Sequence, residues 1–175
     1  EITACARAAR VGEEGPQVSR VQQVAGARFE QWVEAQLLVA RSRGLLVHAE
    51  HTQAVARVIR GKVVYAAPGV ADYVLCLRDG RYAAVEAKAC DGPRLYRSRI
   101  GPLQARHLDA VARGGALALL IVEFSGAAIE RFAVPWIDVP WARARSADSA
   151  SVADLVSWRI APGSCYLERF VWGPS

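Results

Sequence analysis

Residues 70–90 read VADYVLCLRDGRYAAVEAKAC, and this stretch decides the fold. Tyr73 to Leu77 is an apolar, β-prone run, and Asp79-Gly80 is a strong signal for a two-residue hairpin turn. A second strand-like run follows over Arg81 to Lys88. We therefore predict two neighbouring antiparallel strands joined by a tight turn.

The predicted hairpin brings charged groups together. In this register Tyr73 lies opposite Val85, and Asp72 lies opposite Glu86. Glu86 and Lys88 are two residues apart on one strand, so their side chains point to the same face. Most of their neighbours are alanine or valine, and a bound divalent cation is one way to offset the cost of burying such charges. An alternative stays open, in which these are solvent-facing positions and Asp72 is a turn residue.

The rest of the chain alternates helical and strand patterns. A long amphipathic helix is predicted over Gln17 to Arg43, and Gly44 ends it. A second helix is predicted over Pro102 to Arg113, with an apolar face made of Leu103, His107, Ala110 and Val111. The other predicted elements are strands at Leu45–Val47, Lys62–Ala66, Ala116–Phe124 and Ile129–Pro135, a short helix near Val152–Trp158 and a final strand near Tyr166–Trp172. This order indicates an α/β fold with a central sheet flanked by helices.

The length of 175 residues and the 53% apolar composition favour a single domain. We expect residues 1–16 to be a loose leader, residues 17–175 to form the domain, and residues 48–68 to form a short arm or loop. Residue 1 is Glu and the sequence contains no Met, so we expect the natural start to lie upstream or to have been removed.

The charge is +5, and it comes almost entirely from arginine, with 20 Arg against 2 Lys. Guanidinium groups pair bidentately with phosphates, so this balance suits a nucleic acid partner. A biased genomic base composition explains the same ratio equally well. One of the two lysines is Lys88, at a position where arginine could not act as a neutral base.

The cysteines and histidines give no sign of a zinc site. Cys5, Cys76, Cys90 and Cys165 are scattered, without a CxxC pair, and are predicted to be reduced structural thiols. His48 and His51 have HxxH spacing but no third ligand, and we interpret them as strand-end or DNA-facing residues. The longest apolar run is too short to span a bilayer, and no signal-peptide pattern is present. We expect a cytoplasmic protein with no membrane partner.

Asp, followed by Glu-x-Lys on the next strand of a hairpin, is the arrangement of the PD-(D/E)xK nuclease superfamily. The segment GVADYVLCLRDGRYAAVEAKAC resembles more closely the T-D-Y…Y-x-G-R-Y…F-E-A-K-E-T stretch of the RecU-type Holliday junction resolvases. The segments AGARFEQWV, IGPLQARHLDAV and ALALLIVEF resemble that family's G-x-x-F-E helix, its P-L…H-Q-x-x-H-M helix and the strand that follows. The resemblance spans residues 25–136.

This resemblance implies a restriction-endonuclease-like fold, with a mixed central sheet flanked by helices, and a particular set of site residues. Asp72 and Glu86 correspond to metal ligands, together with the Ala87 carbonyl and Glu30, and Lys88 to the group that orients or activates the attacking water. The implied metal is Mg²⁺, for which Mn²⁺ would substitute. Glu30 shares a predicted helix face with apolar residues, although a salt bridge at the rim explains it as well.

Further implications concern DNA. Gln104 corresponds to the family's helix glutamine, although a solvated helix residue is an equal alternative. The expected phosphate contacts are Arg94, Arg97, Arg99 and Arg106. The substrate implied is a four-way DNA junction, cleaved by a homodimer that presents two sites. Two other functions stay open: a PD-(D/E)xK endonuclease for flaps, single strands or a specific sequence, and a non-catalytic DNA-binding protein of the same fold.

The sequence departs from the family pattern in three places. Ala71 replaces a hydroxyl residue, and Ala89-Cys90 replaces Glu-Thr after the lysine. Loss of these polar groups weakens the support around the site but leaves the core residues in place. The segment 48–68 is shorter than the family's stalk, which projects into the junction centre, so junction selectivity is less secure than nuclease chemistry.

Overall fold

The fold is seen in a computed structural model that describes residues 20–52, 56–59, 62–65, 70–144 and 146–172. The predicted leader, residues 1–16, lies outside the described residues, as does Cys5. Among the described residues, no helix is both long and apolar enough to cross a membrane.

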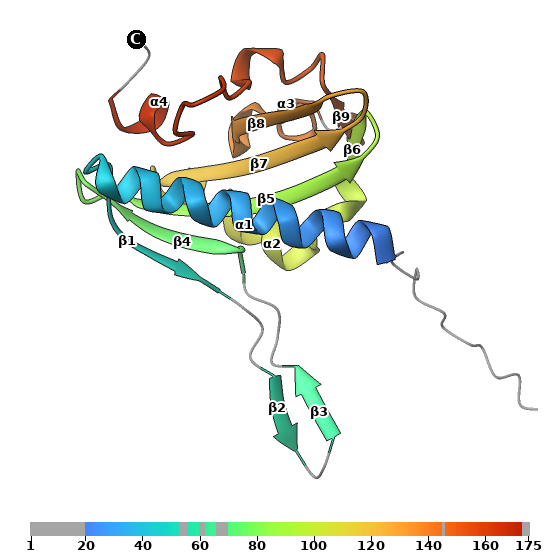
Figure 1. The fold of residues 1–175 in the computed structure, drawn as a ribbon, viewed down its shortest axis with the longest axis horizontal. Helices are drawn as coiled ribbons and strands as arrows, with labels where there is room; N and C mark the ends of the chain where they lie inside the picture. The colour runs from blue at the N-terminus through green and yellow to red at the C-terminus, as the bar shows by residue number, and fades with distance from the viewer. Residues whose placement is uncertain (1–19, 53–55, 60–61, 66–69, 145, 173–175) are drawn as a thin grey trace, which may run out of the picture.

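A five-stranded mixed sheet forms the centre of the molecule, in the order β1-β4-β5-β7-β8 (Figure 1). Its strands are β1 (Leu46–His51), β4 (Tyr73–Leu77), β5 (Tyr82–Asp91), β7 (Leu117–Ser125) and β8 (Ile129–Pro135). All neighbouring pairs are antiparallel except β5 and β7, which run parallel. The strands β5 and β7 are central in this order, and apolar residues pack on both faces of the sheet, which suits their apolar sequences.

The predicted hairpin forms in the predicted register. Tyr73 pairs with Val85 and Cys76 with Tyr82, and the Leu77 amide donates to the Arg81 carbonyl at 2.9 Å across the turn. Gly80 has a φ of 81°, the left-handed conformation that glycine adopts without strain.

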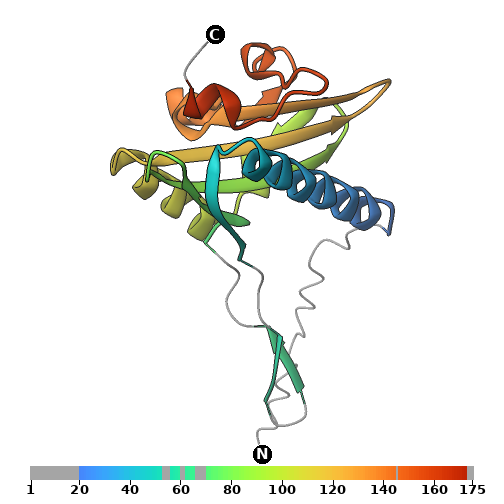
Figure 2. The same cartoon turned by 60° about the vertical axis from the view of Figure 1, so that its left-hand side comes forward.

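Helices cover the two faces of the sheet. The long helix α1 (Arg20–Ser42) crosses one face, and α2 (Pro102–Arg113) lies on the other (Figures 1 and 2). Each face has its own apolar core: Phe29, Val33 and Leu37 of α1 pack on one side, and Leu108 and Val111 of α2 on the other. The predicted mixed sheet flanked by helices is confirmed.

Smaller elements complete the structure. The two-stranded sheet β2 (Ala56–Ile59) with β3 (Lys62–Tyr65) lies between β1 and β4 in the chain, and β6 (Arg94–Tyr96) pairs with β9 (Ser149–Ser151). The remaining helices are η1 (Arg97–Arg99), η2 (Trp136–Asp138), α3 (Pro140–Arg143), η3 (Val156–Trp158) and α4 (Glu168–Val171). Residues 48–51 of the predicted arm instead extend β1, which pairs with β4.

Three predictions for secondary structure were wrong. The final segment is not a strand: α4 forms there, after the buried residues Tyr166 and Leu167. Only Val156–Trp158 of the predicted helix 152–158 is helical, as the single turn η3. The inward face of α2 carries Leu108 and Val111, whereas Leu103 is 49% exposed.

Candidate active site

The site forms where one strand starts and its neighbour continues. β4 begins at Tyr73, whereas β5 runs on beyond Val85, still paired with β7 as far as Asp91. The edge of β5 that β4 covers up to Val85 becomes available from Glu86 onward. The carboxylate of Asp72, just before β4, takes this place: its Oδ2 accepts the Ala87 amide hydrogen at 2.8 Å. A main-chain contact thus fixes Asp72 beside the Glu-Ala-Lys segment.

Glu86 is fully buried on the face of the sheet that α2 covers. Its Oε1 accepts hydrogen bonds from Lys88 Nζ and, at 2.6 Å, from Gln104 Nε2. Lys88 Nζ also lies 3.9 Å from Asp72 Oδ2, so one ammonium group bridges the two carboxylates. The predicted shared patch of two carboxylates and an amine is present.

The second oxygen of Glu86 differs from the first. Oε2 is buried and has no hydrogen-bond partner among the described residues. A buried carboxylate oxygen without a partner is unfavourable, since it loses its hydration without compensation. It is the kind of atom that a bound cation satisfies.

The pKa of Glu86 is raised to about 7: burial is the largest cause, Lys88 opposes it, and the negative charge of Asp72 adds a smaller increase. A cation bound next to Glu86 would favour the ionised form and lower this pKa.

Gln104 is held in place by the start of α2. Its Oε1 accepts the Gly101 amide hydrogen at 2.8 Å, which caps the helix, and its amide nitrogen is thereby turned toward Glu86. A Cβ at position 101 would lie only 3.0 Å from Gln104 Oε1. Glycine at this position therefore leaves room for the glutamine. The alternative of a solvated helix residue is wrong.

Glu30 is not in contact with these groups. It lies exposed on α1, which packs on the opposite face from Glu86. Glu30 does affect Tyr73, the residue after Asp72. Burial is the main cause that raises the pKa of the Tyr73 hydroxyl, and the negative charges of Glu34, Glu30 and Asp72 raise it further. The burial expected for Glu30 from its neighbours on the helix is wrong.

In the part of the chain that the structure describes, no three His, Cys, Asp or Glu side chains gather closely enough to form a metal-binding group. Asp72 and Glu86 nevertheless fit a hard divalent cation, because both offer carboxylate oxygens and Glu86 Oε2 is without a partner. The pair needs further oxygen ligands to fill an octahedral shell.

The four predicted DNA contacts lie on the segment that follows β5. Arg94 is in β6, Arg97 and Arg99 are in η1, and Arg106 is on α2, all with exposed side chains. Arg99 donates to the Ala89 carbonyl at 2.8 Å, beside Lys88. Within the described residues none of the four forms an ion pair with a carboxylate.

The two histidines have different surroundings. His48 is exposed in β1, whereas the His51 ring stacks on Tyr73 with 4.5 Å between ring centroids. His51 Nδ1 also lies 3.4 Å from Glu34 Oε1. This contact places His51 at a strand end, on the side of the sheet that α1 covers. The described cysteines, Cys76, Cys90 and Cys165, are free, as predicted.

Sequence reasoning missed a second buried carboxylate. Glu123 of β7 is fully buried; its Oε2 accepts a hydrogen bond from Arg131 Nε at 2.8 Å and forms an ion pair with Arg131 Nη2 at 2.7 Å. Arg28 Nη2 lies 3.5 Å from its Oε1. The available signal was a single acidic residue within the apolar run predicted to be a buried central strand.

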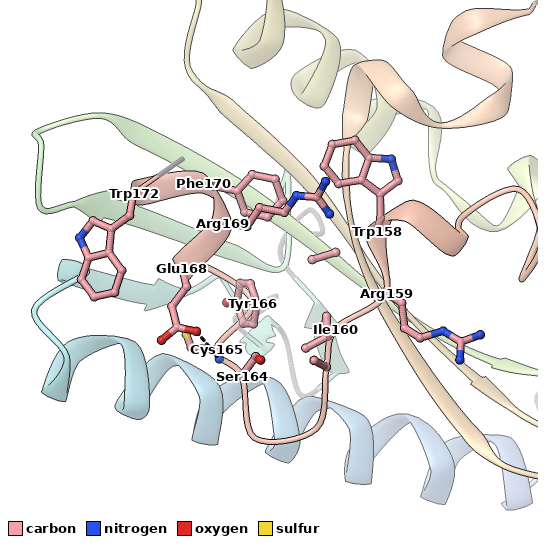
Figure 3. Close-up of a pocket in the computed structure, with 12 residues that line it drawn as sticks. Trp158, Arg159, Ile160, Ser164, Cys165, Tyr166, Glu168, Arg169, Phe170 and Trp172 are labelled. Carbon is pink, nitrogen blue, oxygen red and sulfur yellow. Dashed lines mark hydrogen bonds between the residues drawn. The ribbon is translucent and has the colours of Figure 1, made fainter. Parts of the chain in front are cut away.

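One cavity lies away from these residues. About 520 Å³ in volume, it sits between β8 and the C-terminal segment, where Trp158, Ile160, Tyr166 and Phe170 line it (Figure 3). None of the proposed site residues lines this cavity. This cavity is therefore separate from the site of Asp72, Glu86 and Lys88.

No model of a protein family matches the chain, and a search of curated proteins finds no match either. One similar solved structure is that of Hjc, a Holliday junction resolvase from the archaeal hyperthermophile Archaeoglobus fulgidus. It is 21% identical, covers 76% of this chain and 93% of its own, and has a TM-score of 0.46. The likeness is too distant to assign an activity, so a functional assignment depends on the site itself.

Proposed function

We propose that the chain is a divalent-metal-dependent DNA endonuclease of the PD-(D/E)xK type, with Asp72, Glu86 and Lys88 at its centre. The observation that supports this most is the Asp72–Lys88–Glu86 contact at the start of β4, where the second oxygen of Glu86 has no hydrogen-bond partner among the described residues. An ordinary structural ion pair gains nothing from leaving a buried oxygen without a donor.

Asp72, Glu86 and the Ala87 carbonyl would hold Mg²⁺, with Glu30 as a further ligand and Mn²⁺ as a substitute. The chemistry that such a cation supplies when bound is Lewis-acid stabilisation of the charge that develops on the scissile phosphate. In its presence Glu86 is ionised, because the positive charge lowers its pKa.

Lys88 orients the attacking water. Its Nζ contacts Glu86 Oε1 and lies near Asp72 Oδ2, so its remaining N–H can donate to a water beside the two carboxylates. The water then faces the phosphate in a fixed orientation, which lowers the entropic part of the barrier. Gln104 keeps the Glu86 carboxylate in the orientation that this arrangement needs.

The exposed arginines bind the DNA backbone. Arg94, Arg97, Arg99 and Arg106 are without carboxylate partners among the described residues, so they can pair with phosphates without first breaking an ion pair. Arg99 is held beside Lys88 by the Ala89 carbonyl, so it would contact a phosphate close to the cleaved bond.

The substrate that we propose is a four-way DNA junction. A junction has twofold symmetry and needs paired nicks, which a C₂ homodimer with two sites can make. This finer assignment is supported by the RecU-like motifs, which include Asp72, Glu86, Lys88 and Gln104.

The test compares cleavage of a four-way junction, its constituent duplexes and a flap at equal salt, with and without Mg²⁺. We expect Mg²⁺-dependent paired nicks in the junction and much slower cleavage of duplex. Equal rates on plain duplex would exclude junction selectivity and leave a different endonuclease. Junction binding without nicks under any divalent ion would contradict the enzyme assignment and favour a non-catalytic DNA-binding protein.

A further inference from the structure

Asp72 lies in a bend of the chain, and β4 begins only at the next residue. The pairing of β4 with β5 starts at Tyr73 and Val85, and its pairing with β1 ends at His51 and Tyr73. The paired strands therefore stop one residue short of Asp72. The main chain that carries this carboxylate depends on contacts beyond the ends of these strands.

Thr52 makes two contacts with this bend. It follows the last residue of β1, and its amide donates to the Asp72 carbonyl at 2.9 Å. Its hydroxyl donates to the carbonyl of the preceding residue, Ala71. One residue thus holds two successive carbonyl groups, one with its main chain and one with its side chain. A substitution can remove the side-chain contact and leave the main-chain contact in place.

The main chain of the bend decides where the Asp72 carboxylate lies. Only two side-chain torsions separate the carboxylate from the main chain, so a rotation of the main chain at residues 71 and 72 displaces it. Its present contacts leave little room for that, since Oδ2 accepts the Ala87 amide hydrogen at 2.8 Å and lies 3.9 Å from Lys88 Nζ. Hydrogen bonds weaken steeply as distance and angle depart from these values.

The place of the bend in the chain makes its support important. β2 and β3 lie between Thr52 and Val70 in the sequence and away from the five-stranded sheet in space (Figures 1 and 2). The contacts of Thr52 with Ala71 and Asp72 join the two ends of this excursion where it meets the sheet. They tie Asp72 to β1 rather than to β2 and β3.

We propose that Thr52 is a positioning residue of the site: its hydroxyl, through the Ala71 carbonyl, fixes the bend that directs the Asp72 carboxylate toward the Ala87 amide and the bound cation. Thr52 acts through the main chain of the bend and does not itself hold the cation. This inference rests on the proposed function, because it takes Asp72 as a ligand of that cation.

The first test needs neither metal nor DNA. It measures hydrogen exchange of the Ala87 amide in the metal-free full chain by NMR. Thr52→Val removes the hydroxyl and keeps the shape of the side chain, whereas Thr52→Ser keeps the hydroxyl. We expect Thr52→Val to speed exchange at Ala87 by about tenfold, and Thr52→Ser to leave it near the wild-type rate. The Ser151 amide, which donates to the Asp154 carboxylate at 2.8 Å, is the internal control for general loosening.

The second test measures Mn²⁺ binding to the full chain by electron paramagnetic resonance of the free ion. Thr52→Val should weaken Mn²⁺ binding by about tenfold, as loss of a supporting contact around a metal site does, and Thr52→Ser should restore it. Ser42→Ala is the matched control: it also removes a hydroxyl that donates to a main-chain carbonyl, that of Val39 at 2.8 Å, at the end of α1. We expect Ser42→Ala to bind Mn²⁺ like the wild type.

Four results would overturn the inference: a wild-type exchange rate at Ala87 in Thr52→Val, an equal acceleration at Ser151, a Thr52→Ser variant as impaired as Thr52→Val, or equal Mn²⁺ affinity of Thr52→Val and Ser42→Ala. Failure of the proposed function looks different. If Asp72→Asn binds Mn²⁺ as tightly as the wild type, or the wild type binds none, the metal site itself is wrong and both proposals fall. If Asp72→Asn loses Mn²⁺ binding while Thr52→Val does not, only the positioning role of Thr52 is wrong.

Discussion

Glu86 and Glu123 are both fully buried glutamates on the neighbouring parallel strands β5 and β7, yet their surroundings differ. Glu123 faces α1 and has an arginine for each oxygen. Glu86 faces α2, shares one oxygen between Lys88 and Gln104, and leaves the other without a partner among the described residues. Buried charge is therefore not in itself a sign of chemistry. The informative feature is the incomplete set of partners.

The largest expected effect is on the cleavage rate, which should fall much more for a Glu86 variant than for a Glu123 variant. Glu86→Gln should reduce Mg²⁺-dependent cleavage by about a thousandfold, because several kcal/mol of charge stabilisation depend on the metal that we propose it holds. Single-turnover cleavage of a junction measures this loss. Glu123→Gln should lose far less activity than Glu86→Gln. Comparable losses for the two variants would remove the distinction between them.

The free energy of unfolding should depend on the two residues in the opposite order: loss of Glu123 should destabilise the protein more than loss of Glu86. Glu123→Ala leaves Arg131 beside the core without its carboxylate partner. Loss of one partner from a fully buried ion pair costs about 3 to 5 kcal/mol of unfolding free energy. Arg131 is 27% exposed and can be partly hydrated, so we expect a loss of about 3 kcal/mol or somewhat less. Glu86→Gln should cost less, or even stabilise the metal-free protein. Urea unfolding with metal removed checks the order, and a larger loss for Glu86→Gln would contradict it.

The metal-free protein should also respond to pH through Glu86. Burial is the largest cause that raises its folded-state pKa to about 7 from the ordinary value of 4.5, so the folded protein holds this proton more tightly than the unfolded chain does. The stability it contributes is fully present below the unfolded-state pKa and is lost as pH rises through the folded-state pKa. Stability should therefore fall between about pH 4.5 and 7. Glu86→Gln should flatten this part of the profile, and an unchanged slope in that variant would show that another group is responsible.

The smallest predicted effect concerns Gln104. Gly101→Ala places a Cβ at 3.0 Å from Gln104 Oε1, so the side chain must shift and its bond to Glu86 weakens. We expect cleavage to fall by about tenfold, in line with the loss of a supporting contact around a metal site. Gly114→Ala, at the other end of α2, serves as a control. Equal effects of the two substitutions would indicate damage to the helix rather than to the site.

The hairpin could be predicted because two local signals agree. The Asp79-Gly80 turn fixes the register, and the alternation of side chains then places Glu86 and Lys88 on one face. The same register places Asp72 beside Glu86, because Tyr73 pairs with Val85. The C-terminal segment could not be predicted in this way, because a short apolar run such as Tyr166-Leu167 fits a strand or a buried helical turn equally well.

The error on α2 has a physical cause in the site. The prediction placed Leu103 inward because it is apolar, but the inward row is Gln104, Leu108 and Val111. Glu86 needs a donor inside the protein, and Gln104 supplies it, so a polar residue occupies a core-facing position. Glu30 shows the converse: its apolar neighbours suggested burial, but it lies exposed on the flank of α1.

The most direct test of the metal-dependent site compares Asp72→Asn with Asp138→Asn in single-turnover cleavage of a four-way junction, with and without Mg²⁺. Asp138 forms an ion pair with Arg143 and is not part of the proposed site. We predict that Asp72→Asn loses Mg²⁺-dependent cleavage while it still binds the junction, and that Asp138→Asn cleaves like the wild type. Undiminished cleavage by Asp72→Asn would contradict the proposed chemistry.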